Sequence, residues 1–295
     1  MDDKATPTPK ITQEMINLFD DYTHLSLDRR KFMDNLAKLT GSMTLAVTAA
    51  GLMASNVQAA GLSSETDERL DISEATYPGA KGEMKGYLAV PKEAGPFGAV
   101  IVVHENRGLN AHTRDVARRV ALEGFIALAP DYLSDVGGTP ADEDQARRMF
   151  SQVSAVDVTA NGVATIAYLK TLPKSNGKVA AMGFCWGGGT VNDLAVASPD
   201  LLAAVPYYGR QPDAAGVPNI KAKVMAHYGG LDERINAGIP AFEAALKEAG
   251  TDYQIFIYEG ANHAFNNDTS DARYDETAAR LAWDRTMALF KQTIG

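Results

Sequence analysis

From residue 69 to the end of the chain, short apolar segments alternate with longer amphipathic ones. The short segments are predicted to be strands; they are 69–73, 85–90, 99–103, 125–129, 178–182, 202–207, 223–228 and 253–258. Apolar residues recur three and four positions apart in the expected helices, 113–122, 142–150, 156–172, 190–197, 241–249 and 275–292. This alternation predicts an α/β domain with a mostly parallel sheet, helices on both faces and an antiparallel edge formed by the first two strands.

The first 60 residues have a different pattern, so we divide the chain into residues 1–60 and 61–295. One face of an amphipathic helix is predicted by apolar residues at helical spacing, namely Met15, Leu18, Phe19, Tyr22 and Leu25. This pattern favours a retained helical arm that packs on the domain or on a second copy of the chain, which would make a homo-oligomer.

The same segment also carries the signals of an export sequence. Asp28-Arg29-Arg30-Lys31-Phe32-Met33 resembles a twin-arginine motif, an apolar run follows at 45–54, and Val57-Gln58-Ala59 is suited to cleavage. The run of about ten residues is too short to span a bilayer. Two interpretations stay open: a periplasmic protein whose arm is cleaved off, or a cytoplasmic protein that retains it.

The composition narrows the classes of partner. The 295 residues carry a net charge of −9, whereas nucleic acids and anionic membranes select basic patches, so neither is expected as a partner. With a single cysteine, the chain can form no intramolecular disulfide. No spacing of His, Cys and Glu resembles that of a metal site, and no phosphate-loop motif is present. The expected partner is a small molecule, and we expect no metal and no cofactor.

That cysteine lies in a motif that exposes a nucleophile. Gly183-Phe184-Cys185-Trp186-Gly187-Gly188-Gly189 stands between an expected strand and an expected helix. It has the form of a nucleophile elbow, a strained turn that needs glycine on either side because a Cβ would clash with neighbouring elements. The turn also places Cys185 at a helix N-terminus, where the positive end of the dipole favours a thiolate. The alternatives are a buried apolar cysteine and a redox-sensing thiol, although no resolving cysteine exists.

A cysteine nucleophile needs a base, and the base needs an acceptor that orients it. Asp232 and His263 follow Cys185 in the order nucleophile, acid, histidine, and each comes directly after an expected strand. Because the carboxyl ends of parallel strands meet at one edge of a sheet, the three side chains are expected to lie together.

The other histidines are weaker candidates. His104 and His227 end apolar strands and compete for the base role, His112 starts a helix and is expected to be exposed, and His24 lies in the arm.

The loop His104-Glu105-Asn106-Arg107-Gly108 follows the first buried strand and supplies further candidates. We assign the two oxyanion-hole amides to the backbone N–H groups of Asn106 and of Trp186, the residue after the nucleophile. Glu105 could hydrogen-bond the thiol or compete with His263 for its proton. The alternative is a surface carboxylate paired with Arg107.

These motifs resemble those of the dienelactone hydrolase family, the carboxymethylenebutenolidase-like enzymes. The resemblance covers about residues 65–293 and rests on Glu105-Asn106-Arg107-Gly108, Ala129-Pro130-Asp131, the Cys185 motif, Tyr208-Gly209, Asp232 and Asn262-His263-Ala264-Phe265. It implies an α/β-hydrolase fold and a Cys185–His263–Asp232 triad. It also implies that Glu105 engages the resting cysteine and releases it as thiolate when an anionic substrate binds.

The chain departs from the family shortly after the histidine. The family has a cation there that holds the substrate carboxylate, but Asn266-Asn267-Asp268 offers none, which argues against dienelactone itself as the substrate. Arg107 and Arg210 could hold an anion instead, and Tyr132 and Tyr208 are further candidates for contact with the substrate.

The function predicted from these residues is hydrolysis of an activated ester, lactone or thioester through a covalent acyl-enzyme. The rival interpretation is a scaffold with little or no catalysis that acts in binding or assembly. The unexplained arm and the missing arginine favour that rival.

Overall fold

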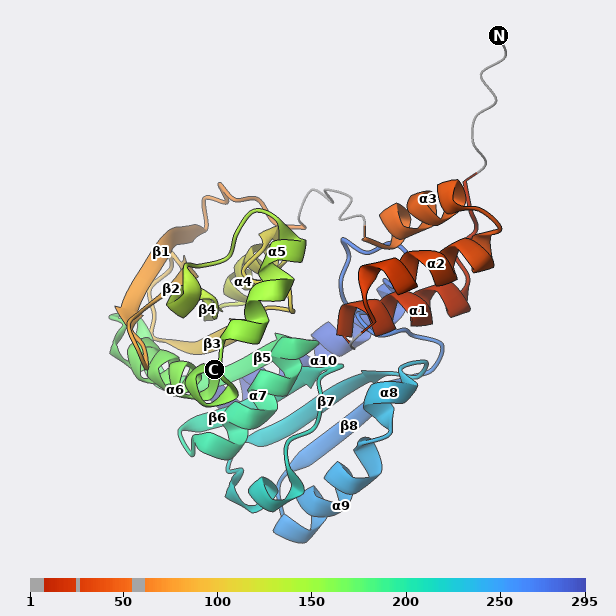
Figure 1. Ribbon diagram of the computed structural model, residues 1–295. Helices are drawn as coiled ribbons and strands as arrows, with labels where there is room; N and C mark the ends of the chain where they lie inside the picture. The colour runs from red at the N-terminus through yellow and green to blue at the C-terminus, as the bar shows by residue number, and fades with distance from the viewer. Residues whose placement is uncertain (1–7, 25–26, 55–61) are drawn as a thin grey trace.

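The computed structural model describes residues 8–24, 27–54 and 62–295. One sheet has the strand order β1-β2-β4-β3-β5-β6-β7-β8 (Figure 1). Its strands are β1 (Leu70–Pro78), β2 (Glu83–Pro91), β3 (Phe97–Val103), β4 (Ile126–Asp131), β5 (Ser175–Phe184), β6 (Leu201–Tyr207), β7 (Lys223–Gly229) and β8 (Tyr253–Tyr258). β1 pairs antiparallel with β2 and β2 with β4, whereas the six remaining strands run parallel. The predicted α/β fold with an antiparallel edge is confirmed.

Helices cover both faces of this sheet (Figure 1). They are α4 (Ala111–Leu122), α5 (Glu143–Met149), α6 (Ala155–Thr171), α7 (Trp186–Ala197), α8 (Glu233–Asn236), α9 (Ile239–Ala249) and α10 (Glu276–Ile294). Apolar side chains of α4 and α10 fill one core, and those of α6, α7 and α9 fill the other. β3 is apolar throughout because successive side chains alternate between these two cores.

Several element boundaries differ from the sequence-based expectation, and in two places a local interaction explains the difference. β1 and β2 are longer than expected because their ladder extends to the pair Pro78 and Glu83, so the turn lies at 79–82. There Gly79 donates its N–H to the carbonyl of Gly82 at 2.7 Å. α4 begins two residues early because the Asn110 side chain accepts from the N–H of Thr113 and caps the helix.

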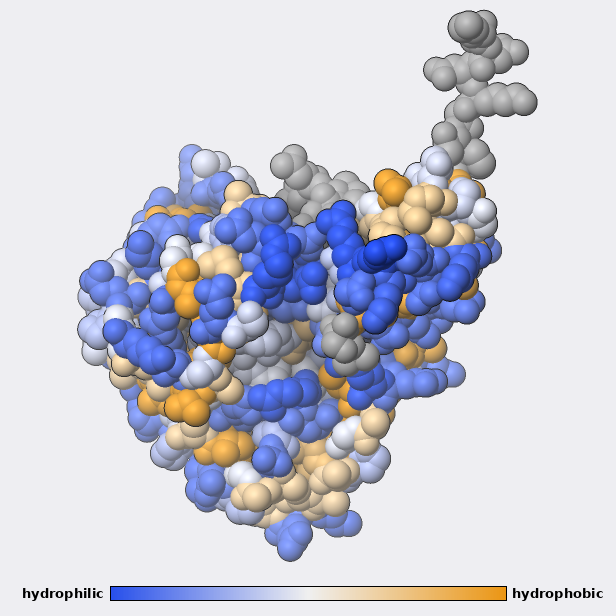
Figure 2. Space-filling model, in the orientation of Figure 1, coloured by the Kyte–Doolittle hydropathy of each residue, from blue (hydrophilic) through white to orange (hydrophobic). Residues whose placement is uncertain are grey.

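The arm consists of three helices, α1 (Gln13–His24), α2 (Arg29–Thr40) and α3 (Met43–Ala54), with a small core of their own (Figure 1). Tyr22 stacks on Phe32 with ring centroids 4.6 Å apart, and Leu36 is fully buried beside them. α3 exposes Met43 and Val47, and apolar residues gather at this end of the arm in Figure 2. The helical arm expected from the amphipathic spacing is therefore present.

The candidate export signals fall on the arm in different ways. Asp28 of the arginine motif is the N-cap of α2, and the apolar run 45–54 lies within α3. The expected cleavage site at 57–59 and the division at residue 60 lie outside the described residues. In the described part of the chain, no helix by itself has the length and apolar composition to cross a membrane. α2 and α3 meet those criteria only as a pair bent by 109°.

Candidate active site

Cys185 stands at the bend between β5 and α7. Its backbone has φ 55° and ψ −113°, and its N–H donates to the carbonyl of Tyr207 at 3.0 Å. Among the described non-glycine residues, positive φ occurs only at Cys185, Tyr208 and Ala264. All three lie next to the site described below. Such strained conformations cluster at functional sites because the surrounding structure must be built to hold them.

Glycines beside Cys185 let the elbow pack closely on the sheet. A Cβ on Gly183 would lie 2.4 Å from the carbonyl oxygen of Gly187, and one on Gly187 would lie 2.4 Å from that of His104. Both distances are far below van der Waals contact and involve backbone atoms. The sequence rule that this turn requires glycine therefore has a direct steric cause here.

His263 and Asp232 form a hydrogen-bonded pair that is buried beside Cys185. His263 Nδ1 lies 2.5 Å from Asp232 Oδ2, and the other carboxylate oxygen accepts the N–H of Ile235 at 3.2 Å. Asp232 caps α8 after β7, and His263 lies in the loop after β8. The carboxyl ends of β7 and β8 thus lie side by side, as expected for parallel strands of one sheet.

The charges of this group support one another. Burial acts to lower the pKa of the His263 imidazole, but the negative charges of Cys185 and Asp232 outweigh it and raise the pKa to about 10. Burial acts to raise the pKa of the Asp232 carboxyl, yet the hydrogen bond from His263 and its positive charge lower it. The arrangement therefore favours the protonated, imidazolium form of His263 beside the Asp232 carboxylate.

The arm places a second imidazole against the sulfur. His24 Nδ1 lies 3.6 Å from Cys185 Sγ, and the His24 ring centroid lies 4.6 Å from that of His263. Burial, and after it the charge of His263, holds the pKa of His24 well below its usual range, so this imidazole is neutral. Sequence reasoning missed His24 because it precedes Cys185 by 161 residues and ends a helix whose apolar spacing signals only packing.

Three polar contacts hold α1 across the site. They are Gln13 Nε2 to Asn262 Oδ1 at 2.5 Å, Arg273 Nη1 to Asp20 Oδ1 at 3.2 Å and Arg147 Nη2 to Tyr22 Oη at 3.2 Å. In addition, the Asn106 side chain donates to the carbonyl of Thr23 at 3.1 Å. The arm thus packs on the domain of its own chain, and the expected homo-oligomer stays a prediction.

Glu105 does not have the partners expected of it. Its carboxylate accepts from Tyr208 Oη at 3.4 Å and from Asn267 Nδ2 at 3.0 Å. Within the described ranges the hydrogen bonds of Glu105 include none to Cys185. The alternative pairing with Arg107 is also wrong, since Arg107 donates to Asp144 at 2.9 Å.

Two adjoining cavities open onto the sulfur. The larger, of about 490 Å³, is lined by His24, Asn106, Cys185, Trp186, Tyr208, Arg210 and His263, among others. The smaller, of about 40 Å³, is lined by Glu105, Asn106, Arg107, Cys185, His263 and Arg273, among others. The structure therefore brings together every candidate site residue of the sequence analysis except Tyr132.

Tyr132 is a correction. Its ring is 1% exposed and packs edge-on against His104 and Trp186, outside the residues that line either cavity. It lies at the end of β4 with its side chain turned into the core, so it cannot contact a substrate in this arrangement.

Two other histidines are occupied elsewhere. His104 Nδ1 contacts the carbonyl of Glu105 at 2.7 Å, and its Nε2 accepts the N–H of Tyr132 at 3.2 Å. His227 is buried between Tyr258 and Thr286. Neither is free to act as the base.

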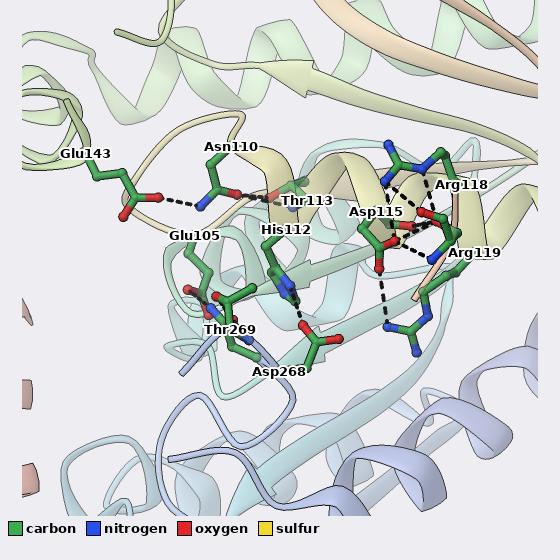
Figure 3. Close-up of polar contacts among 12 residues, drawn as sticks. Glu105, Asn110, His112, Thr113, Asp115, Arg118, Arg119, Glu143, Asp268 and Thr269 are labelled. Atoms are coloured by element: carbon green, nitrogen blue, oxygen red, sulfur yellow. Dashed lines mark hydrogen bonds and ion pairs between the residues drawn. The ribbon is translucent and has the colours of Figure 1, made fainter. Parts of the chain in front are cut away.

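His112 was expected to be exposed, and this is wrong. It is 5% exposed, and its Nδ1 lies 3.0 Å from Asp268 (Figure 3). The early start of α4 turns His112 toward the loop that follows His263. Above Glu105 in the same view, the Asn110 side chain donates to the Glu143 carboxylate (Figure 3).

A cation does follow His263, but later than expected. Arg273 lines the smaller cavity with Cys185 and His263, and its guanidinium contacts Asp20 of the arm. Sequence reasoning missed it because the intervening turns bring it back to the site, which no local pattern signals. Arg210 also lines a cavity, where it is paired with Asp193.

Comparisons with known proteins identify a family for most of the chain. Residues 84–294 match the model of the dienelactone hydrolase family, and residues 5–41 match a second model described as YqhI-like. A Synechocystis protein named "Putative carboxymethylenebutenolidase" is 33% identical over 234 residues, which cover 73% of this chain and 94% of that protein. An Escherichia coli K12 protein of the same name is 32% identical, covering 77% of this chain and 89% of that protein.

Solved structures show the same relationship. A crystal structure of a "Putative Dienelactone Hydrolase" from Klebsiella pneumoniae aligns with a TM-score of 0.69 at 31% identity, covering 76% of this chain and 99% of that one. A dienelactone hydrolase-like promiscuous phosphotriesterase from metagenomic libraries aligns with the same TM-score at 26% identity, covering 77% and 100%. The chain is thus a hydrolase with the α/β-hydrolase fold, and it belongs to the dienelactone hydrolase family.

Proposed function

We propose that the protein hydrolyses an activated ester, lactone or thioester with Cys185 as the nucleophile. The observation that carries this proposal is the position of the sulfur. It stands on a strained elbow at the mouth of two cavities, next to a histidine whose far nitrogen is held by a buried carboxylate at 2.5 Å. A structural cysteine needs neither the strain nor the paired histidine.

In the first half of the reaction the Cys185 thiolate attacks the carbonyl carbon of the substrate. The electrons of the C=O bond move to oxygen, and the backbone N–H groups of Asn106 and Trp186 stabilise the oxyanion. When the carbonyl re-forms, the leaving alkoxide or thiolate takes a proton from Nε2 of His263. A thioester between the acyl group and Cys185 remains.

In the second half His263, now neutral, takes a proton from water. The resulting hydroxide attacks the thioester carbonyl, and collapse of the second oxyanion expels the Cys185 thiolate and releases a carboxylic acid. Asp232 keeps the imidazole in the tautomer that presents Nε2 to the substrate. A thiolate nucleophile suits activated acyl groups rather than amides.

The cations of the cavities point to a substrate that carries a carboxylate. Arg273, Arg107 and Arg210 line these cavities, and each is already paired with an acid: Asp20, Asp144 and Asp193 respectively. Of these acids Asp20 belongs to the arm, so a substrate carboxylate can take its place on Arg273 when α1 shifts. Two features favoured a non-catalytic scaffold, namely the unexplained arm and the missing arginine. The arm now has a place over the site, and Arg273 supplies a cation after His263.

The test compares wild type with Cys185→Ala and Cys185→Ser on nitrophenyl esters, lactones and thioesters, with intact-mass detection of an acyl adduct. Wild type should show turnover and an adduct on Cys185, and the alanine variant should show neither. The serine variant should form an ester adduct slowly, because the hydroxyl is a weaker nucleophile. A Ser151→Ala variant, altered on an exposed turn, serves as the matched control. Unchanged turnover in Cys185→Ala would refute the proposal.

A further inference from the structure

Three metal-ligand side chains converge from three distant segments of the chain. They are His24 at the end of α1, Cys185 at the elbow and His263 after β8, and one donor atom of each lies within 4.8 Å of the other two. Each of the three is buried or nearly so, and all three line the 40 Å³ cavity. Such a cavity has room for one ion and a water molecule.

One of the three donor separations matches that of donors around zinc. With Zn–S near 2.3 Å and Zn–N near 2.0–2.1 Å, a tetrahedral angle places sulfur and nitrogen about 3.5 Å apart. Cys185 Sγ and His24 Nδ1 are 3.6 Å apart. Two atoms joined by a direct S–H···N hydrogen bond could have the same spacing, so this distance by itself does not define a metal site.

The second observation is an unpartnered atom on the opposite side. His263 Nε2 is buried and has no hydrogen-bond partner among the residues that the structure describes. Its other nitrogen is held by Asp232, which forces the lone pair of the neutral ring onto Nε2. A histidine whose far nitrogen is held by a carboxylate is the arrangement that metal-binding histidines adopt.

His24 presents its ring in the same way. Its Nδ1 faces the amide nitrogen of Asn106 at 3.5 Å as well as the sulfur. Because an amide nitrogen is a donor only, this contact makes Nδ1 the unprotonated nitrogen of His24, and a metal beside the sulfur would take the place of the long contact from Asn106. His263 offers a second lone pair from Nε2 once it has lost the proton on that nitrogen.

We propose that His24, Cys185 and His263 form a site for a soft divalent transition metal, of which Zn²⁺ is the best fit, with the fourth position open to the cavity. Thiolate and imidazole ligands select Zn²⁺ over Mg²⁺ and Ca²⁺. When the ion binds, the Cys185–His263 pair loses one proton to solvent, and both groups donate an electron pair to the metal.

The site goes beyond the proposed hydrolysis and opposes it. A sulfur bonded to Zn²⁺ is not free to attack a carbonyl, and a coordinated His263 cannot carry a proton. The bound ion also links α1 to the catalytic domain through His24. Metal binding and acylation are therefore mutually exclusive states of one sulfur, and the arm takes part only in the first.

The experiment titrates the full-length, metal-stripped protein with Co²⁺ as a spectroscopic probe, and then with Zn²⁺ against a chromophoric chelator. We expect one Co²⁺ per chain, with a thiolate-to-cobalt charge-transfer band and the strong visible bands of a tetrahedral ion. Cys185→Ala should abolish the charge-transfer band. His24→Ala should weaken Zn²⁺ binding at least about 100-fold, since one of three protein ligands is lost.

Two further variants on α1 separate ligation from general damage to the arm. His24→Cys restores a soft donor and should recover most of the affinity, with a stronger charge-transfer band. Asp21→Ala removes an exposed carboxylate on the same helix and should leave the affinity unchanged. Equal Zn²⁺ affinity in wild type and His24→Ala, or a cobalt spectrum without a thiolate band, would overturn the proposal. Because the titration contains no substrate, its result does not depend on whether the protein hydrolyses esters.

Discussion

Replacing Gly187 with alanine tests whether the close approach of the elbow helix to the sheet sets the geometry of the oxyanion hole. Gly187 is in the first turn of α7, where a Cβ would lie 2.4 Å from the carbonyl oxygen of His104 and 2.5 Å from that of Val103. Both are backbone atoms at the end of β3, and Val103 is held in register with Gly183 of β5. Neither atom can swing aside as a side chain would.

The size of the effect follows from these distances. Ordinary van der Waals contact starts at 3.4 Å, so α7 and the end of β3 must separate by about 1 Å. The two proposed oxyanion donors lie on opposite sides of this contact, with Trp186 on α7 and Asn106 on the loop after β3. A displacement of about 1 Å at a reacting group costs about 100-fold in rate, and loss of one oxyanion donor costs about 100- to 1,000-fold. Overpacking should also lower the free energy of unfolding by about 1–3 kcal/mol.

The assay measures ester hydrolysis, iodoacetamide alkylation of Cys185 and unfolding in urea on the same preparations. We expect Gly187→Ala to lose at least about 100-fold in kcat/KM while staying folded. Its alkylation rate should change much less, because alkylation develops no oxyanion. The matched control is Gly189→Ala, two residues along the same helix, whose Cβ would meet only the Arg210 side chain.

One result would refute this reasoning. If folded Gly187→Ala keeps hydrolysis within about threefold of Gly189→Ala, the contact between α7 and β3 does not set the donor geometry. A loss shared equally by hydrolysis and alkylation would point to a displaced sulfur instead, which also contradicts the argument.

Three other perturbations give expected outcomes. Asp232→Asn should lower kcat about 10⁴-fold because the amide no longer fixes the His263 tautomer, and steady-state ester kinetics showing a loss below tenfold would contradict this. Burial lowers the pKa of His227 to about 3, so the folded protein keeps this ring neutral while the unfolded chain protonates it below about pH 6.5. The contribution of His227 to the free energy of unfolding is therefore complete above that pH. It falls by about 1.4 kcal/mol per pH unit below it, which is about 2.7 kcal/mol by pH 4.5. Urea unfolding should show a shallower loss of stability in acid for His227→Gln than for wild type, and the same pH dependence in both proteins would contradict this. Leu36→Ala should lower the free energy of unfolding of the arm by about 2–5 kcal/mol. It should also raise the rate at which Cys185 reacts with a bulky maleimide, relative to iodoacetamide. No such increase is expected if α1 does not shield the sulfur.

Local patterns along the chain were sufficient to predict the main domain. The sequence of β3 is continuously apolar because both faces of that strand are buried. Such a strand can be identified from its own sequence without knowledge of its neighbours. The elbow was predictable because sterics demand glycine at Gly183 and Gly187 whatever surrounds them. His263 and Asp232 could be identified as the candidate base and its orienting acid from their order along the chain and their positions after strands. This worked because a parallel sheet brings the ends of its strands together.

The contacts that escaped prediction depend on how separate segments dock. His24 and Arg273 reach the site through the packing of α1 and through a multi-turn loop, and neither leaves a periodic signal. The partners of Glu105 are Tyr208 and Asn267, which lie in loops after other strands, so the sequence of its own loop cannot encode them. Tyr132 was assigned to the site from its position at a strand end, but which way such a side chain points depends on register.

The tether between α1 and the catalytic domain has a practical consequence for ligand discovery. An imidazole held on the same chain competes for the space above the sulfur at an effective concentration on the order of millimolar. The apparent affinity of a free compound for the space at Cys185 is therefore its intrinsic affinity multiplied by the fraction of molecules in which the arm has moved away. Fragment screens and inhibitor soaks should be run on a variant with a loosened arm beside the intact chain, since the difference between the two measures how strongly the protein competes against its own ligands.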